Sequence, residues 1–188
     1  MRHKIYALFD FELNRRKGLS FEEFLDLPKV RAAQIVQYRD KINSTHIKLK
    51  NILYFKKFFK GTVIANDDLE LAKEVDGLHV GQEDVLRYET DIEKSVMWLK
   101  NELKDKILGL STHNLSQIQK ANDLPLDYIG LGAYRATLTK EVTNILGEKT
   151  SLLAKASKHD VAVIGGVKSS DKIEGVTYLV LGSNLYEN

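Results

Sequence analysis

The sequence predicts a (β/α)8 barrel, because short apolar runs alternate with helix-like stretches and eight such runs occur. Most runs carry consecutive Val, Ile, Leu or Tyr residues, as strands buried on both faces do. Strand and helix in strict alternation require parallel pairing with right-handed crossovers, and eight such units close a barrel. An open, doubly wound sheet is the alternative. The predicted strands lie within residues 4–10, 34–41, 61–68, 77–84, 106–114, 126–133, 160–167 and 177–183.

Helical periodicity fills most of the intervals between these runs. The predicted helices are 20–27, 47–59, 69–75, 92–103, 115–121 and 143–157. Ser20 and Glu23 have the spacing of a capping box at the start of the first of them. Residues 168–175 are too few for a full helix, and only 184–188 follow the last strand. We therefore expect a shortened seventh crossover and no full terminal helix.

Length and composition favour one domain, residues 1–188, since 43% of the chain is hydrophobic. The chain has no cysteine, which excludes disulfides and thiolate metal sites. The apolar part of the N-terminal ten residues is too short for a signal peptide or a membrane span. A net charge of +2 does not suggest a nucleic-acid partner. We expect a cytoplasmic protein with neither nucleic-acid nor membrane partners.

Polar residues follow the predicted strands, and in a barrel these strand ends meet at one rim. Gln37, Arg39 and Lys41 alternate with period two, so their side chains share one face. On the lumen side, buried cations need carboxylate partners or a bound polyanion. Arginine offers a bidentate fork to phosphate and lysine a point charge.

Two carboxylates and an amide end neighbouring strands. Asn66 and Asp67 close the third predicted strand, and Asp84 follows the fourth. Such hard oxygen ligands suit a Mg²⁺ ion that keeps waters and shares phosphate oxygens. Alternatively, Asp67 caps the helix that begins near Leu69 and Asp84 caps the next one. Their joint arrival beside Arg39 and Lys41 favours the metal.

The late strands carry the signals of a second anion site. Thr137, Thr139 and Lys140 follow the sixth strand, and Gly165 and Gly166 end the seventh. Hydroxyls, an ammonium group and backbone N–H groups bind phosphate, and the last two strand loops are the usual phosphate corner of these barrels. Two anion sites suggest a transfer between two phosphorylated molecules.

The histidines point to no hydrolytic chemistry. His79 lies in the middle of a strand, as a hydrogen-bonded core residue would, and His113 is a rim or loop residue. No histidine pair has the spacing of a zinc site on a helix face, and no serine lies in a G-x-S-x-G elbow.

Six motifs in order carry a family resemblance: QYRDK, NDDLELA, DGLHVGQED, GLSTHN, DYIGLGAYRATLTK and IGGV, from about residue 34 to 167. The set resembles thiamine-phosphate synthase and the family that it shares with the thiazole tautomerases, and it is closer to the synthase branch. The resemblance implies a (β/α)8 barrel, commonly a homodimer. The implied reaction couples a pyrimidine methyl pyrophosphate to a thiazole phosphate and releases pyrophosphate.

The resemblance also implies roles for individual residues. Mg²⁺ would be held by Asp67 and Asp84. The thiazole phosphate would be held by Thr137, Thr139 and the backbone at Gly166. The pyrimidine pyrophosphate would contact Gln37, Arg39, Lys41, Asn66, Ser111 and Lys140, of which Arg39, Lys41 and Lys140 are the catalytic cations. In that family pyrophosphate leaves first, and the thiazole nitrogen captures a pyrimidine methyl cation, so no protein nucleophile is needed.

Two positions depart from the synthase pattern, and a third separates it from the tautomerases. Val180 stands where the eighth strand usually has serine, and Ala136 replaces the proline before the first threonine. Ala133 lies near the place of the tautomerases' acid–base histidine, which argues for the synthase, although His113 could substitute. A tautomerase and a non-catalytic phosphate-binding barrel are the alternatives.

Overall fold

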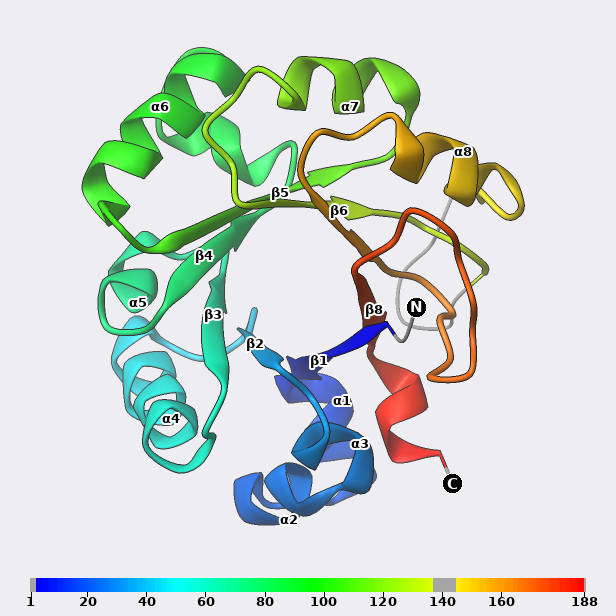
Figure 1. Cartoon of the computed structure of the whole chain (residues 1–188). Coiled ribbons are helices and arrows are strands. Elements are labelled where there is room, and N and C mark those ends of the chain that lie inside the picture. Colours follow the sequence, from blue (N-terminus) through cyan, green and yellow to red (C-terminus); the bar gives the residue numbers. More distant parts are fainter. Residues whose placement is uncertain (1–2, 137–144, 188) are drawn as a thin grey trace.

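Eight parallel strands form a closed barrel in the order β1 to β8 (Figure 1). The computed structural model describes residues 3–136 and 145–187. Every neighbouring pair is parallel, and β8 returns to β1 through the pairs Lys4–Tyr178 to Ala7–Leu181. Closure rules out the open sheet. The strands are β1 (Lys4–Asp10), β2 (Ile35–Arg39), β3 (Thr62–Asn66), β4 (Gly77–Val80), β5 (Ile107–Thr112), β6 (Tyr128–Leu131), β7 (Asp160–Val163) and β8 (Tyr178–Leu181).

Helices surround the barrel on its outside (Figure 1). They are α1 (Phe11–Lys17), α2 (Phe21–Asp26), α3 (Pro28–Arg31), α4 (Thr45–Phe58), α5 (Leu69–Lys73), α6 (Ile92–Leu103), α7 (Leu115–Ala121) and α8 (Lys149–Lys155), with 3-10 turns η1 (Asp84–Arg87) and η2 (Ser183–Tyr186). The predicted bounds of α6 and α7 are confirmed. The capping box is also present, since Ser20 accepts from Glu23 N–H and Glu23 accepts from Ser20 N–H.

Two helices were not predicted, and one was predicted too long. Asp10 caps the start of α1 by accepting from Leu13 N–H, and Gly18 (φ 72°) ends it. The expected helix 143–157 is helical only as α8, because Leu146 N–H and Gly147 N–H bond to carbonyls of the loop after β6. Residues 143 and 144 lie outside the described part.

The apolar core has two layers. Outward-facing side chains of the strands pack against the helices, and both Leu78 and Val80 belong to this layer. A smaller cluster fills the lumen, made of Tyr6, Ile35, Ile64, Tyr128, Ala162 and Val180. Apolar side chains therefore fill the interior of the barrel, and the polar groups lie at the carboxyl ends of the strands.

The helical layer is incomplete near the C-terminus, as the sequence predicts. Residues 164–177 connect β7 to β8 without a described helix, and only η2 follows β8 (Figure 1). The terminal segment is held by Lys29, whose Nζ donates to the carbonyls of Asn184 at 2.8 Å and Glu187 at 2.6 Å. Among the described residues, the helices are all too short or too polar to cross a bilayer.

Candidate functional site at the barrel mouth

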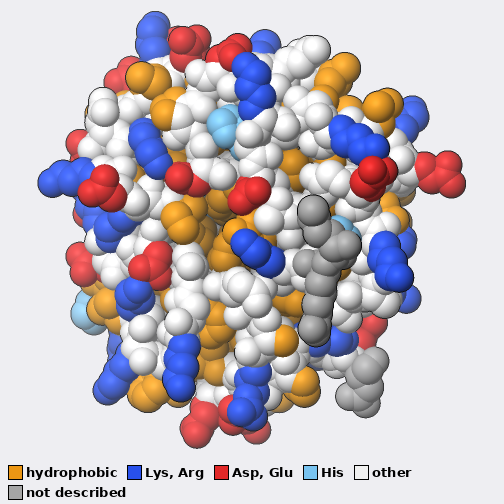
Figure 2. All heavy atoms as spheres, viewed as in Figure 1, with side chains coloured by type: hydrophobic (Ala, Val, Ile, Leu, Met, Phe, Trp, Pro, Cys, Tyr) orange, Lys and Arg blue, Asp and Glu red, His pale blue; other side chains and the backbone are white. Residues whose placement is uncertain are grey.

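A cavity of about 620 Å³ opens at the carboxyl ends of the strands. All eight strands or the loops that follow them contribute to its lining. Figure 2 shows acidic and basic side chains close together near the centre of the face viewed along the barrel. This is the rim on which the sequence places its candidate residues.

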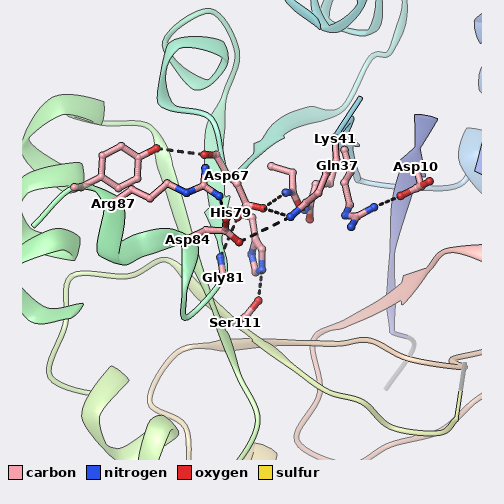
Figure 3. A network of polar contacts seen from close by, with 12 residues as sticks. Asp10, Gln37, Lys41, Asp67, His79, Gly81, Asp84, Arg87 and Ser111 are labelled. Carbon is pink, nitrogen blue, oxygen red and sulfur yellow. Dashed lines mark hydrogen bonds and ion pairs between the residues drawn. The ribbon is translucent and has the colours of Figure 1, made fainter. Parts of the chain in front are cut away.

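The three alternating residues of β2 reach this cavity together. Gln37 is 6% exposed and faces the lumen, whereas Arg39 and Lys41 lie at the mouth. Arg39 forms an ion pair with Asp10, its register partner at the end of β1 (Figure 3). A carboxylate partner thus compensates one of the two cations, and the guanidinium stays at the cavity wall.

The side chain of Lys41 lies close to the carboxylates of both Asp67 and Asp84 (Figure 3). The Lys41 Nζ lies 3.4 Å from Asp67 Oδ2 and 4.0 Å from Asp84 Oδ2. Asp67 also accepts from Gly81 N–H at 3.0 Å, and Asp84 pairs with Arg87. The Lys41 ammonium group thus draws both carboxylates to one part of the cavity wall.

The capping alternative for these aspartates is wrong. The cap of α5 is Asp68, whose side chain accepts from Glu70 N–H and Leu71 N–H. Asp67 precedes it with a φ of 59°, a conformation that Asp and Asn tolerate better than most residues. Asp84 begins η1 without a side-chain capping bond. Their carboxylates are therefore directed to the cavity.

The donor set fits Mg²⁺. The two carboxylates are hard oxygen ligands at the cavity wall, and Mg²⁺ is often bound by one or two carboxylates, waters and substrate phosphates. No cluster of three His, Asp or Glu that could hold a metal alone occurs among the described residues. Such a site would therefore be completed by water and phosphate oxygens.

Buried and partly buried hydrogen bonds connect the residues on the floor of the cavity. Tyr6 donates to Gln37 at 2.7 Å, and Gln37 donates to Asn66. On the other side, the His79 ring lies 2.9 Å from both Tyr128 Oη and Ser111 Oγ. Burial lowers the pKa of His79 to about 4. The imidazole is neutral at physiological pH.

The late strands contribute small residues and backbone to the cavity. Its lining includes the two glycines after β7, Gly165 and Gly166, and Gly182 and Ser183 after β8. Both Gly165 (φ 95°) and Gly166 (φ 59°) have the left-handed backbone that glycine adopts readily. Val180 belongs to the apolar lumen cluster. Thr137, Thr139 and Lys140 lie outside the described residues.

The loop after β7, which contains Gly165 and Gly166, is hydrogen-bonded to the loop after β6. Arg135 donates to both oxygens of Asp171, at 2.7 and 2.9 Å, and to the carbonyl of Gly166 at 3.0 Å. Bonds from Arg135 hold the pKa of Asp171 below its usual range, against the effect of burial. The loops after β6 and β7, on which the sequence predicts the second anion site, are therefore joined by hydrogen bonds.

Among the cavity residues that sequence reasoning missed are Asp10, Tyr6 and Tyr128. Asp10 ends β1 as the other polar residues end their strands, so its position was a usable signal. Tyr6 and Tyr128 have no such signal, because tyrosine is common in strands. Their meeting across 122 residues depends on barrel closure.

Comparisons with known proteins agree on one family. A family profile described as thiamine monophosphate synthase matches residues 22–178. A thiamine-phosphate synthase of Persephonella marina is 33% identical over 145 residues, which are 74% of this chain and 66% of that protein. One of Synechococcus is 33% identical over 141 residues, which are 71% of this chain and 37% of that protein. The matches cover less than two thirds of these two relatives.

A longer match and two solved structures complete the comparison. The thiamine-phosphate synthase of Dictyoglomus thermophilum is 32% identical, over 98% of this chain and 86% of its own. A thiamine phosphate pyrophosphorylase from Pyrococcus furiosus superposes with a TM-score of 0.69 at 19% identity, covering 97% and 86% of the two chains. A type I 3-dehydroquinate dehydratase from Clostridium difficile reaches 0.57 at 13%, covering 97% and 85%, so such likeness establishes the fold alone. The matched profile spans most of the chain, which therefore belongs to the thiamine monophosphate synthase family.

Proposed function

We propose that this protein is a thiamine-phosphate synthase. It joins 4-amino-2-methyl-5-(diphosphooxymethyl)pyrimidine to a thiazole phosphate, giving thiamine phosphate and pyrophosphate. The observation that carries the proposal is a cavity with Asp67, Asp84, Arg39 and Lys41 on one wall and the Gly165–Gly166 loop on another. Two phosphorylated substrates need two anion sites that face each other.

The wall formed by β2 to β5 binds the pyrimidine pyrophosphate in this proposal. Arg39 and Lys41 contact the phosphate oxygens, joined by Lys140, which lies outside the described residues. The amide and hydroxyl side chains of Gln37, Asn66 and Ser111 orient the rest of the molecule. Cations fixed in place stabilise the charge that grows on the leaving group and cost no reorganisation at that moment.

The bond changes need no protein nucleophile. The bond between the pyrimidine methylene carbon and the pyrophosphate oxygen breaks, and its electron pair leaves with pyrophosphate. The lone pair of the thiazole nitrogen then forms the new carbon–nitrogen bond. A Mg²⁺ held by Asp67 and Asp84 would add positive charge at the leaving pyrophosphate.

The other wall holds the thiazole phosphate. Backbone N–H groups of the loop at Gly166 receive it, with the hydroxyls of Thr137 and Thr139, which lie outside the described residues. Since Val180 brings no hydroxyl from β8, the backbone and Ser183 carry more of this contact. Positioning the thiazole nitrogen near the methylene carbon supplies the second part of catalysis.

A thiazole tautomerase is the competing function. The cavity lining holds Ala133, which cannot transfer a proton, and beside it His113, whose Nδ1 lies 2.8 Å from the carbonyl of Gly132. Interconversion of thiazole carboxylate phosphate isomers without any pyrimidine substrate would favour the tautomerase and contradict the synthase.

Formation of thiamine phosphate from the two precursors with Mg²⁺ is the decisive assay. We expect product from the wild type and a loss of about 10³-fold in kcat/KM for Asp84→Ala. Glu83→Gln is the matched control, because this exposed neighbour carries the same charge and does not line the cavity. Binding of a thiazole phosphate without product formation by the wild type would contradict the synthase and favour a binding protein.

Metal dependence, assembly and location belong to the same proposal. Activity should disappear with a chelator and return with Mg²⁺. Light scattering of the purified protein tests a homodimer, and cell fractionation tests a cytoplasmic location.

A further inference from the structure

A continuous chain of hydrogen bonds crosses the lumen from the proposed metal ligand Asp67 to Ser111. Its first half runs from Asp67 through Asn66 and Gln37 to Tyr6. Its second half joins Tyr6 Oη to Tyr128 Oη at 2.9 Å, Tyr128 to His79 Nδ1 at 2.9 Å, and His79 Nε2 to Ser111 Oγ at 2.9 Å. The Asp67 and Ser111 ends both face the cavity; Figure 3 shows the labelled members Asp67, Gln37, His79 and Ser111.

The direction of the first half follows from Asp67. An ionised carboxylate can only accept, so Asn66 must turn its NH2 group towards Asp67 and its oxygen towards Gln37. Gln37 must then give its NH2 group to Asn66 and its oxygen to Tyr6. Tyr6 can meet that oxygen only by donating its single hydroxyl hydrogen.

The hydrogen bonds of the two tyrosines continue across the lumen in the same donor-to-acceptor direction. Burial raises the pKa of both Tyr6 and Tyr128 well above the usual range, so each keeps one hydrogen to give. Tyr6 gives its hydrogen to Gln37, so it must accept from Tyr128. Tyr128 then presents only lone pairs to His79.

The directions of these hydrogen bonds determine which ring nitrogen of His79 carries the hydrogen. Tyr128 accepts, so Nδ1 must carry the hydrogen and donate to it. A neutral imidazole carries one hydrogen, so with Nδ1 donating to Tyr128 its Nε2 is bare. Ser111 must donate its hydroxyl hydrogen to Nε2, and it presents only lone pairs to the cavity.

The barrel provides space for this arrangement at two glycines. His79, Gly109 and Tyr128 are register partners on β4, β5 and β6, and Tyr128 reaches across Gly109 to the imidazole. A Cβ at Gly109 would lie 2.2 Å from Cζ of Tyr128, and one at Gly130 would lie 3.0 Å from Cε1 of His79. A side chain at Gly109 would therefore overlap the ring that completes the chain.

We propose that Tyr6 and Tyr128 are positioning residues that hold His79 in its Nδ1–H tautomer and thereby make Ser111 an obligate hydrogen-bond acceptor. The consequence for substrate choice rests on the proposed function. An acceptor at Ser111 fits the 4-amino group of the pyrimidine, which donates. A 4-oxo analogue with the same pyrophosphate offers an acceptor there, and the two lone pairs face each other unpaired.

Histidine tautomers can be read directly by ¹⁵N NMR of the substrate-free protein at neutral pH. The chain has five histidines, and His79→Gln identifies the signal of His79. We expect the Nδ1–H form in the wild type. In Tyr128→Phe the acceptor for Nδ1 is lost, and we expect the Nε2–H form to be populated. An Nε2–H ring in the wild type would overturn the proposal, and so would an unchanged tautomer in Tyr128→Phe.

Kinetic discrimination gives a second readout. The wild type should prefer the 4-amino over the 4-oxo substrate, and Tyr128→Phe should lower that preference about tenfold, the value of one ordinary hydrogen bond. Tyr6→Phe is the second variant should Tyr128→Phe not fold, because it frees the Tyr128 hydrogen to turn towards His79. Unchanged discrimination in a folded variant contradicts the proposal.

Tyr178→Phe is the matched control. Tyr178 packs edge-on against the ring of Tyr6 and lies outside the hydrogen-bond chain, so tautomer and discrimination should both stay as in the wild type. The two levels of the proposal can fail separately. An Nδ1–H ring in a protein that makes no thiamine phosphate refutes only the function, whereas product formation with an Nε2–H ring refutes only the positioning role.

Discussion

Strands β2 to β5 and strands β6 to β8 end in different residues at the same cavity. The first group ends in Arg39, Asn66 and Asp67, Asp84 beyond β4, and Ser111, most of them joined by ion pairs or hydrogen bonds. Among the described residues, the lining that follows the second group has no charged side chain and includes the glycines Gly132, Gly165, Gly166 and Gly182. Charged side chains suit a mobile pyrophosphate with a metal, whereas a backbone loop suits a phosphate that stays bound.

Removing a cation from the wall formed by β2 to β5, the first wall, should have the largest effect of the changes that separate the two walls. Arg39→Met deprives the pyrophosphate of its arginine and leaves Asp10 without its partner. We expect kcat/KM for the pyrimidine substrate to fall by about 10²-fold or more, with the KM of the thiazole phosphate unchanged. Arg16→Met, at an exposed position of α1 that does not line the cavity, is the control. An equal rise in both KM values would show that the two walls are not separate.

The first wall should also make stability depend on pH. The pKa of His79 falls from 6.5 to about 4 on folding, so below pH 6.5 the unfolded chain takes up a proton that the folded chain refuses. The free energy of unfolding should therefore drop by about 3 kcal/mol as pH falls from 6.5 to 4. Urea unfolding of the wild type and His79→Gln between pH 6.5 and 4 tests this prediction. The other titratable groups contribute equally to the pH dependence of both proteins, so the difference between the two curves is due to His79. Parallel curves would contradict the prediction.

Space in the lumen should be nearly as critical as charge. In Gly109→Ala the new methyl group overlaps the Tyr128 ring, and we expect a loss of about 2 kcal/mol of unfolding free energy. Tyr128→Leu should relieve part of that loss, so a double-mutant cycle of the two changes should show strong coupling. Additive effects would mean that the ring is not the cause.

The second wall is expected to respond to backbone changes. Gly166→Ala puts a Cβ at a φ of 59° and 2.8 Å from Cβ of Arg135. We expect a cost of about 1–2 kcal/mol in stability and a higher KM for the thiazole phosphate only. Gly147→Ala is the control, because Gly147 also has a positive φ (50°) but open space and lies away from the cavity. Gly147→Ala should lower stability without changing the KM of the thiazole phosphate. A rise in KM for this variant would show that the effect of Gly166→Ala on KM is not specific to the cavity.

Much of the fold was predictable, because strands and helices reveal themselves locally. Runs of β-branched and aromatic residues mark the strands, and the capping box at Ser20 marks a helix start with its own two hydrogen bonds. Short helices such as α3 lack a full period, so pattern reasoning passed over them. Predicted helix 143–157 was too long because contacts with the β6 loop, far from it in sequence, compete with helix hydrogen bonds.

The sequence alone determined which residues reach the cavity at the strand ends. Alternate side chains of a strand share one face of the barrel, and the carboxyl ends of all its parallel strands lie at one rim. Gln37, Asn66 and Ser111 could be named on that basis. Only the tertiary structure decided their partners: Arg39 with Asp10, Asp68 rather than Asp67 as the cap, and His79 with Tyr128 and Ser111. The reason is barrel closure, which sets the register of strands distant in sequence and thereby gives each buried polar group its one available partner.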